Sequence, residues 1–221
     1  MAASTRRPPG RPRLSDTTVP TTDQIVQVAG DLFMRRGYRT VTVEMVADRA
    51  GLTKAAVYYH FADKAALLSE SLIAMFDRVR TGADRVLSGP DTLQERLVRI
   101  AEAVLALPEP LMRFEILLRE ARDDLTPAQL ASIRAAEDGV SDAVVCAMRT
   151  GVARGELRSV DPTLLGHAFL SLLYIGQSRA PGGGLRFPDH AASARALVDM
   201  LWNGVAGRRT PAASAGARSV P

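Results

Sequence analysis

The sequence has few of the residues on which disulfide-bonded and metal-binding proteins depend. It contains one cysteine, Cys146, so an intramolecular disulfide is excluded and a reducing compartment is favoured. Its three histidines, His60, His167 and His190, lie far from one another and from the cysteine. No nucleophile and base stand in a recognisable pattern. We therefore expect no metal, no cofactor and no enzymatic activity.

Long apolar runs and aromatic residues are also scarce. No apolar run of membrane-spanning length occurs, and the N-terminus carries arginines without an apolar signal segment. We therefore expect a cytoplasmic protein that does not contact a membrane. Aromatic residues make up only 5% of the chain while hydrophobic residues make up 47%, which favours closely packed helices with a core of Ala, Leu and Val.

Positive charge is concentrated near the N-terminus. Residues 1–62 contain nine Lys and Arg against five Asp and Glu, whereas the remaining residues contain nineteen of each. The whole net charge of +4 therefore lies in the first segment. Such an asymmetry is typical of a module that binds a polyanion, joined to a second module that does not.

The segment Thr42 to Phe61, TVEMVADRAGLTKAAVYYHF, predicts a helix-turn-helix motif. Gly51 lies where the chain must reverse, because glycine adopts positive φ freely. Thr42 and Thr53 are placed as N-caps of the two helices. Six apolar residues recur at helical spacing and would form the buried face: Val46, Ala47, Ala50, Leu52, Val57 and Phe61.

The second of these helices carries polar and aromatic side chains that suit DNA. Lys54, Tyr58, Tyr59 and His60 would be exposed and able to meet phosphates and base edges in a major groove. A packing unit without a DNA partner gains little from such side chains. This segment therefore predicts DNA binding.

The rest of the chain is typical of helices joined by short breaks, and no strand is expected. We expect a basic disordered arm at 1–20, a DNA-binding domain at 21–80 with its motif at 42–61, a helical C-terminal domain at 81–206 and a disordered tail at 207–221. The expected helices outside the motif are Thr22 to Arg36, Asp63 to about Leu87, Asp91 to about Leu107, Leu111 to Arg122, Thr126 to about Arg154, Asp161 to about Arg179 and Asp189 to about Val205.

The segment Leu32 to Leu68, LFMRRGYRTVTVEMVADRAGLTKAAVYYHFADKAALL, closely resembles the N-terminal domain of TetR-type (TetR/AcrR) transcriptional regulators. The resemblance includes the Gly37-Tyr38 pair, Ala50-Gly51, the string from Tyr58 to Phe61, and Lys64. It implies an all-α fold of about nine or ten helices, in which three form the DNA-binding domain and the others form a ligand-binding and dimerisation bundle.

The resemblance also assigns DNA contacts, which lie at the motif and just after it. It places phosphate contacts at Thr42, Tyr58, His60 and Lys64, and contacts with bases or the groove wall at Lys54, Ala55, Ala56 and Tyr59; Thr53 is expected at the same surface. Ala55 and Ala56 depart from the family, where Gly and Thr are frequent. A methyl contact with thymine is one replacement for the missing hydroxyl.

The N-terminal arm has two interpretations that the sequence leaves open. Arg11 and Arg13 flank Pro12 in an arrangement that resembles an AT-hook core and would fit an A·T-rich minor groove. Alternatively, together with Arg6 and Arg7, they form a solvated basic tail that attracts phosphates without preference. Both interpretations predict stronger DNA binding.

Candidate residues in the C-terminal part belong to apolar stripes at helical spacing, which usually serve packing. Candidates for a ligand cavity are Met112, Phe114, Met148, His167, Phe169 and Tyr174. Candidates for a dimer face on the last two helices are Leu164, Leu165, Ala168, Leu172, Ile175, Ala194, Leu197, Val198 and Leu201. Cys146 is interpreted as a buried, inert thiol rather than a redox sensor.

The leading hypothesis is a homodimeric repressor that binds a palindromic double-stranded DNA operator and is released by a small molecule. An activator, or a regulator controlled by a protein, is the alternative within the same class. A helical ligand-binding or adaptor protein without specific DNA binding is the alternative from another class.

Overall fold

A computed structural model describes residues 22–182 and 184–203, and within these residues it is all-helical. The helices are α1 (Thr22–Arg36), α2 (Val43–Ala50), α3 (Lys54–His60), α4 (Lys64–Leu87), α5 (Leu93–Leu105), α6 (Met112–Ala121), α7 (Pro127–Ala153), α8 (Pro162–Gly176) and α9 (His190–Asn203). The only β pairing among the described residues is an isolated bridge between Arg179 and Leu185. The predicted fold class is confirmed. The arm at 1–20 and the tail at 207–221 lie outside the described residues.

Local capping signals explain where the first helices begin. Each of three capping side chains accepts a hydrogen bond from the backbone N–H three residues further along the chain. The distances are 3.3 Å for Thr42, 3.2 Å for Thr53 and 2.7 Å for Asp63. Gly51 ends α2 in the left-handed region with φ of 70°, as the sequence predicts for the turn. These bonds fix α2, α3 and the start of α4 without help from distant residues.

The long helix α7 begins as expected, whereas two other helix ends differ from expectation. Thr126 and Gln129 form a reciprocal capping box at the start of α7. Helix α5 begins after Thr92 rather than Asp91, because Thr92 and Glu95 form a second capping box. Helix α8 ends at Gly176, short of the expected Arg179, and the side chain of the next residue, Gln177, bonds to Val104 at the end of α5 and to Leu111 before α6.

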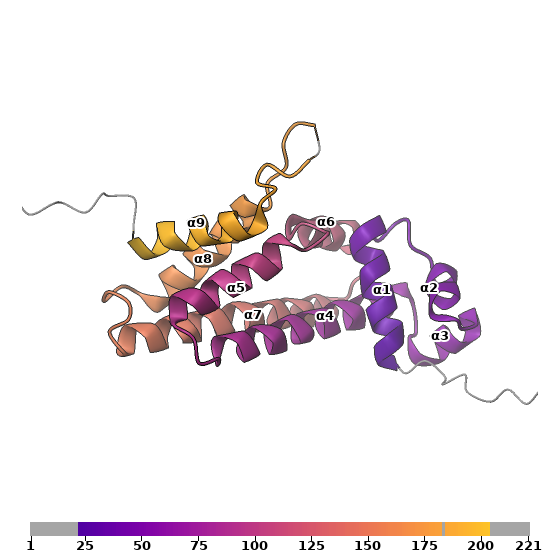
Figure 1. Cartoon of the computed structure of the whole chain (residues 1–221). Helices are drawn as coiled ribbons and strands as arrows, with labels where there is room; N and C mark the ends of the chain where they lie inside the picture. Colours follow the sequence, from indigo (N-terminus) through magenta and orange to yellow (C-terminus); the bar gives the residue numbers. More distant parts are fainter. Residues whose placement is uncertain (1–21, 183, 204–221) are drawn as a thin grey trace, which may run out of the picture.

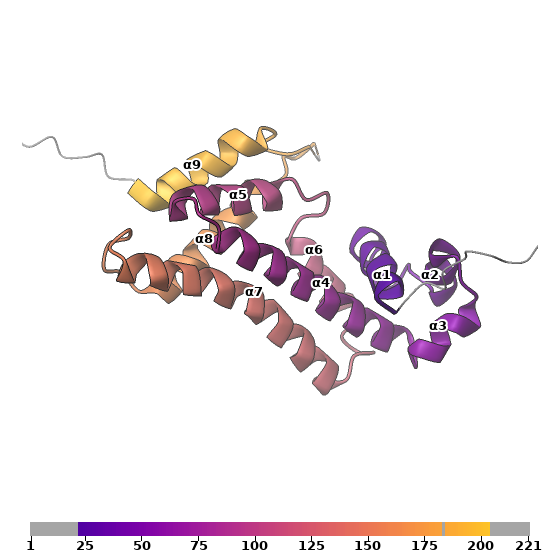
Figure 2. The same ribbon diagram turned by 60° about the horizontal axis from the view of Figure 1, so that its bottom comes forward.

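The helices form two groups along the length of the molecule (Figure 1), and each group encloses a hydrophobic core. The first core joins α1, α2, α3 and the first half of α4 to α6 and the beginning of α7. The second core joins α5, α8 and α9 to the end of α4 and the second half of α7. Helices α4 and α7 lie side by side and run through both cores (Figure 2). The domain boundary expected near residue 80 therefore falls inside the continuous helix α4.

None of the helices in the described ranges is long and apolar enough to cross a membrane. Within the same ranges, no group of three or more His, Cys, Asp or Glu side chains is arranged to hold a metal ion.

Candidate DNA-binding surface and cavity

Helix α3 is held by one buried side chain and presents its other residues outward. Val57 is fully buried in the first core, and Phe61 is buried at the end of the helix. Tyr59 is 86% exposed and Tyr58 is 43% exposed, although both are large aromatic residues. Ala55 is exposed beside them and Ala56 is half-buried. An exposed pair of aromatic side chains on a short, firmly packed helix indicates a surface that binds a partner.

Lys54, the first residue of α3, is already engaged on this surface. Its ammonium group forms an ion pair with Glu44 of α2 and lies 5.6 Å from the centre of the Tyr58 ring. The hydrogen bond with Glu44 raises the pKa of Lys54, and the same bond lowers the pKa of Glu44. Glu44 is a part of the site that the sequence reasoning did not single out.

His60 joins the end of α3 to the beginning of α1. Its Nδ1 lies 3.4 Å from Thr22 Oγ1, and its ring meets the edge of Tyr59 at 5.2 Å between centroids. Thr42 and Thr53 use their hydroxyl oxygens as acceptors for helix caps. The Thr42 hydroxyl also interacts with the carboxylate of Glu44, whereas the hydroxyl hydrogen of Thr53 can donate to a phosphate. The motif residues therefore gather on one surface formed by α1, α2 and α3.

Lys64 extends this surface at the first residue of α4. Its Nζ lies 4.2 Å from the centre of the Tyr38 ring, and burial lowers its pKa. Lys54 and Lys64 are the only lysines of the chain, so both belong to the helix-turn-helix and its immediate continuation. The sequence singles out Tyr38 only as part of the Gly37-Tyr38 pair and does not predict its contact with Lys64. Arg11 and Arg13 lie outside the described residues.

The six residues predicted for a ligand cavity are not brought together. Phe114 is buried in the first core, where its ring meets Phe76 edge-on at 4.8 Å. Met148 and Phe169 are buried in the second core. Met112, His167 and Tyr174 are exposed on α6 and α8. Because the six residues are spread over two cores and the surface, they line no common cavity within the described part of the chain. The packing of each helix decides which way its side chains point.

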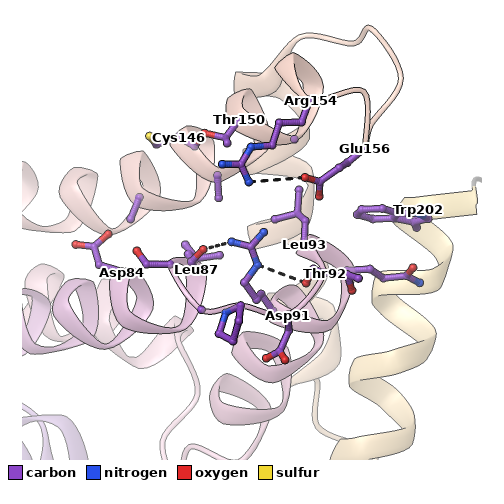
Figure 3. Close-up of a pocket in the computed structure, with 18 residues that line it drawn as sticks. Asp84, Leu87, Asp91, Thr92, Leu93, Cys146, Thr150, Arg154, Glu156 and Trp202 are labelled. Carbon is purple, nitrogen blue, oxygen red and sulfur yellow. Dashed lines mark hydrogen bonds and ion pairs between the residues drawn. The ribbon is translucent and has the colours of Figure 1, made fainter.

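A cavity of about 930 Å³ is present instead (Figure 3), and the helices that line it place it at the end of the bundle away from α3 (Figure 1). It is bounded by the end of α4, the start of α5, the second half of α7 and the end of α9. Its walls combine apolar side chains such as Leu87, Leu93 and Trp202 with polar ones. Such a mixture suits a medium-sized ligand with both apolar and polar parts.

Two arginines around this cavity already bind other groups of the protein. Arg96 donates to the carbonyl oxygens of Leu87 and Thr92, and the first of these bonds caps the C-terminal end of α4. Arg154 lies 4.0 Å from Glu156 and is largely exposed. Cys146 is exposed and lines the same cavity, which corrects the interpretation of this thiol as buried. Residue 146 points outward because the apolar face of α7 is already formed by Val144, Val145 and Met148.

The last two helices present a different apolar face from the one expected. Ala194 and Val198, predicted to be exposed, are fully buried in the second core because α9 packs on α5 through them. Leu164 and Ile175 point outward from α8 and are 62% and 53% exposed. The other five candidates, Leu165, Ala168, Leu172, Leu197 and Leu201, are half-buried.

Comparisons with known proteins agree with this geometry. The family described as "Bacterial regulatory proteins, tetR family" matches residues 25–70, which include α2, α3 and the start of α4. The chain is 28% identical over 121 residues to the HTH-type transcriptional activator FasR of Mycolicibacterium smegmatis, covering 55% of each protein. It is 31% identical over 85 residues to the HTH-type transcriptional repressor KstR2 of Mycobacterium tuberculosis, covering 37% of this chain and 42% of that protein. The chain thus matches about half the length of these curated relatives.

A solved structure extends the similarity over most of the chain. The crystal structure of the TetR family transcriptional regulator PfmR from Thermus thermophilus superposes with a TM-score of 0.61 at 28% sequence identity. The superposition covers 83% of this chain and 99% of the other. The arrangement of α4 to α9 therefore has a counterpart in a solved protein, in addition to the local match of the motif.

Proposed function

Because this chain belongs to the TetR family of bacterial transcriptional regulators, we propose that it binds a palindromic operator as a homodimer and represses transcription until a small molecule releases it. Its place of action would be the cytoplasm, where the DNA is. The observation that carries the proposal is the outward face of α3, with Lys54, Tyr58 and Tyr59 exposed on a helix held by Val57. In a major groove these residues would meet phosphates and base edges.

A dimer is needed for two copies of α3 to read the two halves of a palindrome. Support comes from Leu164 and Ile175, which leave an apolar strip exposed on α8. Such a strip on a monomer favours pairing with a second copy around a two-fold axis. We therefore place the dimer contact at the outward face of α8, with the half-buried residues of α8 and α9 at its margin.

The effector would bind in the cavity between α4, α5, α7 and α9. The cavity is large enough for a drug-sized molecule, and it touches α4, which continues without a break to the DNA-binding head. A ligand that favours one position of α4 would change the separation of the two copies of α3. A coupling of about 1 to 3 kcal/mol changes DNA affinity roughly 5- to 150-fold, which is enough for a switch.

Selection of bound sequences from a random duplex pool tests the DNA-reading role. The intact protein should enrich a palindrome, and Tyr59→Ala should lose this enrichment while remaining folded, because the side chain is almost fully exposed. Val160→Ala, an exposed apolar change between α7 and α8, is the control and should behave as the intact protein. Absence of enrichment by folded, dimeric protein would favour the adaptor alternative.

The single cysteine gives a direct test of the effector site. A fluorescent label on Cys146 would report only on the cavity, because the chain has no second thiol. Compounds that release DNA should also change the label's emission, and Ala147→Trp, which fills the same wall, should abolish both effects. An effector that releases DNA without changing the label, and that still acts on Ala147→Trp, would place its site elsewhere.

Activation is the second candidate for the direction of regulation, because the relative FasR is named as an activator. A reporter gene placed behind the selected operator separates the two. Repression predicts higher reporter output when the regulator is deleted, whereas activation predicts lower output.

A further inference from the structure

Helix α6 packs on the DNA-binding head rather than on the distal cavity. Phe114, Leu117 and Ala121 are buried in the first core together with residues of α1, α2 and α3. Leu125 and Ile133, in the turn after α6 and at the start of α7, belong to the same core. This segment, which the sequence assigns to the C-terminal domain, therefore helps to form the base that supports the helix-turn-helix.

Two side chains of α6 bind main-chain atoms at the end of α1. Arg113 Nε donates to the carbonyl oxygen of Met34 at 3.0 Å, and Glu120 Oε2 accepts the N–H of Tyr38 at 2.7 Å. Gly37 makes this approach feasible, because a Cβ there would lie 2.7 Å from Glu120 Oε2. Since both bonds end on the backbone, α6 fixes the path of the chain through the loop between α1 and α2.

Tyr38 connects this loop to Lys64. Its side chain is 3% exposed and its ring lies 6.0 Å from that of Phe33. Burial raises the pKa of the Tyr38 hydroxyl, and so does the interaction of this hydroxyl with the carboxylate of Asp124 in the turn after α6. The ammonium group of Lys64 lies over the same ring. A ring held at its backbone and at its hydroxyl gives this cation a fixed support through a cation–π contact.

We propose that Tyr38 is a positioning residue for the phosphate contact of Lys64, and that Glu120 and Asp124 hold Tyr38 for this purpose. The inference rests on the proposed function, because it requires a DNA phosphate for Lys64 to bind. A lysine that is already held over a ring loses less conformational freedom when DNA arrives than a free side chain does. Carboxylates at the end of α6 and in the turn after it thereby set the geometry of a cation that faces DNA.

The two lysines of the chain allow a test without DNA. Protein containing lysine labelled with carbon-13 at Cε gives two lysine signals in an NMR spectrum, which Lys54→Arg and Lys64→Arg assign. The signal of Lys64 should be shifted upfield by the Tyr38 ring. Tyr38→Phe keeps the ring but removes the hydroxyl that Asp124 holds, so it should move the Lys64 signal part of the way, as Asp124→Ala does. Tyr38→Leu should abolish the shift.

Asp124 and its neighbour Asp123 form a matched pair that tests whether Asp124 helps to hold Tyr38. Both are exposed and carry the same charge, but only Asp124 interacts with the Tyr38 hydroxyl, and its charge also acts directly on Lys64. Tyr38→Phe, which removes the hydroxyl and leaves the charge of Asp124, separates these two effects. Asp124→Ala should move the Lys64 signal toward that of a lysine without a ring above it, and Asp123→Ala should leave it in place. Because neither change touches the core, this comparison stands even if Tyr38→Leu fails to fold.

DNA binding provides the functional half of the test. With a mixed-sequence duplex of about 40 base pairs, Lys64→Gln should lower the slope of log affinity against log salt by about 0.9, the value for a single phosphate neutralised. Tyr38→Phe should give a smaller decrease, and no further decrease in the Lys64→Gln background. Asp123→Ala should leave the slope unchanged.

Equal lysine spectra for Asp124→Ala and Asp123→Ala, together with a Tyr38→Phe spectrum like that of the intact protein, would overturn the role of Asp124. An unchanged slope for Lys64→Gln would overturn the phosphate contact itself. Failure of the intact protein to bind any duplex would instead reject the proposed function, and the lysine spectra would still show whether Tyr38 and Asp124 hold Lys64.

Discussion

Glu44 of α2 and Lys54 of α3 form an ion pair across the turn of the helix-turn-helix. Both side chains are about half exposed, so solvent and salt reach them. In the free protein, a cation of the helix that would enter the groove is therefore already paired with a carboxylate. DNA must replace this partner or share it.

Glu44→Gln should strengthen binding to duplex DNA. The substitution removes a carboxylate that competes for Lys54 and that would repel nearby phosphates, so we expect a gain of up to about fivefold at low salt, decreasing as salt screens the charges. Fluorescence anisotropy at two salt concentrations measures it. Glu70→Gln, an exposed change further along α4, is the control. An equal gain for both variants would show that the change in net charge alone, and not the loss of the Lys54 partner, strengthens binding.

Two glycines with positive φ should respond differently to alanine. Gly51 has φ of 70° and a Cβ added there would meet open space, so Gly51→Ala should cost only the backbone strain of about 1 to 2 kcal/mol. Gly37 has φ of 83°, and a Cβ there would also displace the carboxylate of Glu120 from the Tyr38 N–H. Both variants should therefore unfold more easily in urea, and Gly37→Ala should lose more stability than Gly51→Ala, as measured by circular dichroism.

Only Gly37→Ala should also alter the Lys64 lysine signal, because only Gly37 contacts Glu120. The same change in both variants would mean that a general loosening of the head, rather than the displacement of Glu120, moves Lys64.

The sequence predicts the DNA-binding head well because its signals are local. Thr42, Thr53 and Asp63 each cap a helix through a residue three positions away, and Gly51 satisfies a turn by its own backbone freedom. The exposed side of α3 follows from the burial of Val57 at helical spacing. None of these features depends on how the C-terminal helices are arranged.

Contacts between distant segments explain what the sequence does not predict. Glu120 reaches Tyr38 across 82 residues, and no spacing rule connects them. The cavity depends on how the ends of α4, α5, α7 and α9 meet, so Cys146 and Trp202 could not be assigned to it from periodicity. Likewise, Ala194 and Val198 share their apolar character with the exposed Leu164 and Ile175. Only the packing of α9 on α5 separates the two pairs.

The ion pair between Arg134 and Glu115 should make stability depend on pH. Hydrogen bonding from Arg134 lowers the pKa of Glu115 below its ordinary value of 4.5. A carboxylate with a lowered folded pKa stabilises the protein above the ordinary value and loses this contribution as pH falls through the folded pKa. Because both groups are partly exposed, we expect no more than about 0.5 kcal/mol.

The measurement compares the free energy of unfolding of the intact protein and Glu115→Gln at neutral pH and at a pH below the folded pKa of Glu115. The intact protein should be the more stable at neutral pH, and the difference should disappear in acid. A difference that persists in acid would show that packing around residue 115, rather than its charge, is responsible.

A charge on the outward face of α8 should prevent dimer formation. Leu164 and Ile175 are largely exposed, so Leu164→Glu and Ile175→Glu should not disturb the monomer's core. If this face pairs with a second copy, burying a carboxylate there is costly, and both variants should sediment as monomers. Leu107→Glu, an exposed change after α5, is the control and should remain dimeric. Dimers in all three variants would place the contact elsewhere.

Deletion of residues 1–15 should weaken DNA binding and reduce its salt dependence. The segment contains Arg6, Arg7, Arg11 and Arg13 and no acidic residue, so its removal should lower the salt slope by up to about 3 to 4, at about 0.9 for each phosphate that the arm neutralises. Comparing A·T-rich with G·C-rich duplexes separates the two interpretations of the arm. An arginine pair in the minor groove favours A·T-rich DNA, so the deletion would weaken binding more on that duplex, whereas a solvated basic tail predicts equal decreases. An unchanged slope on both duplexes would exclude any contact between the arm and DNA.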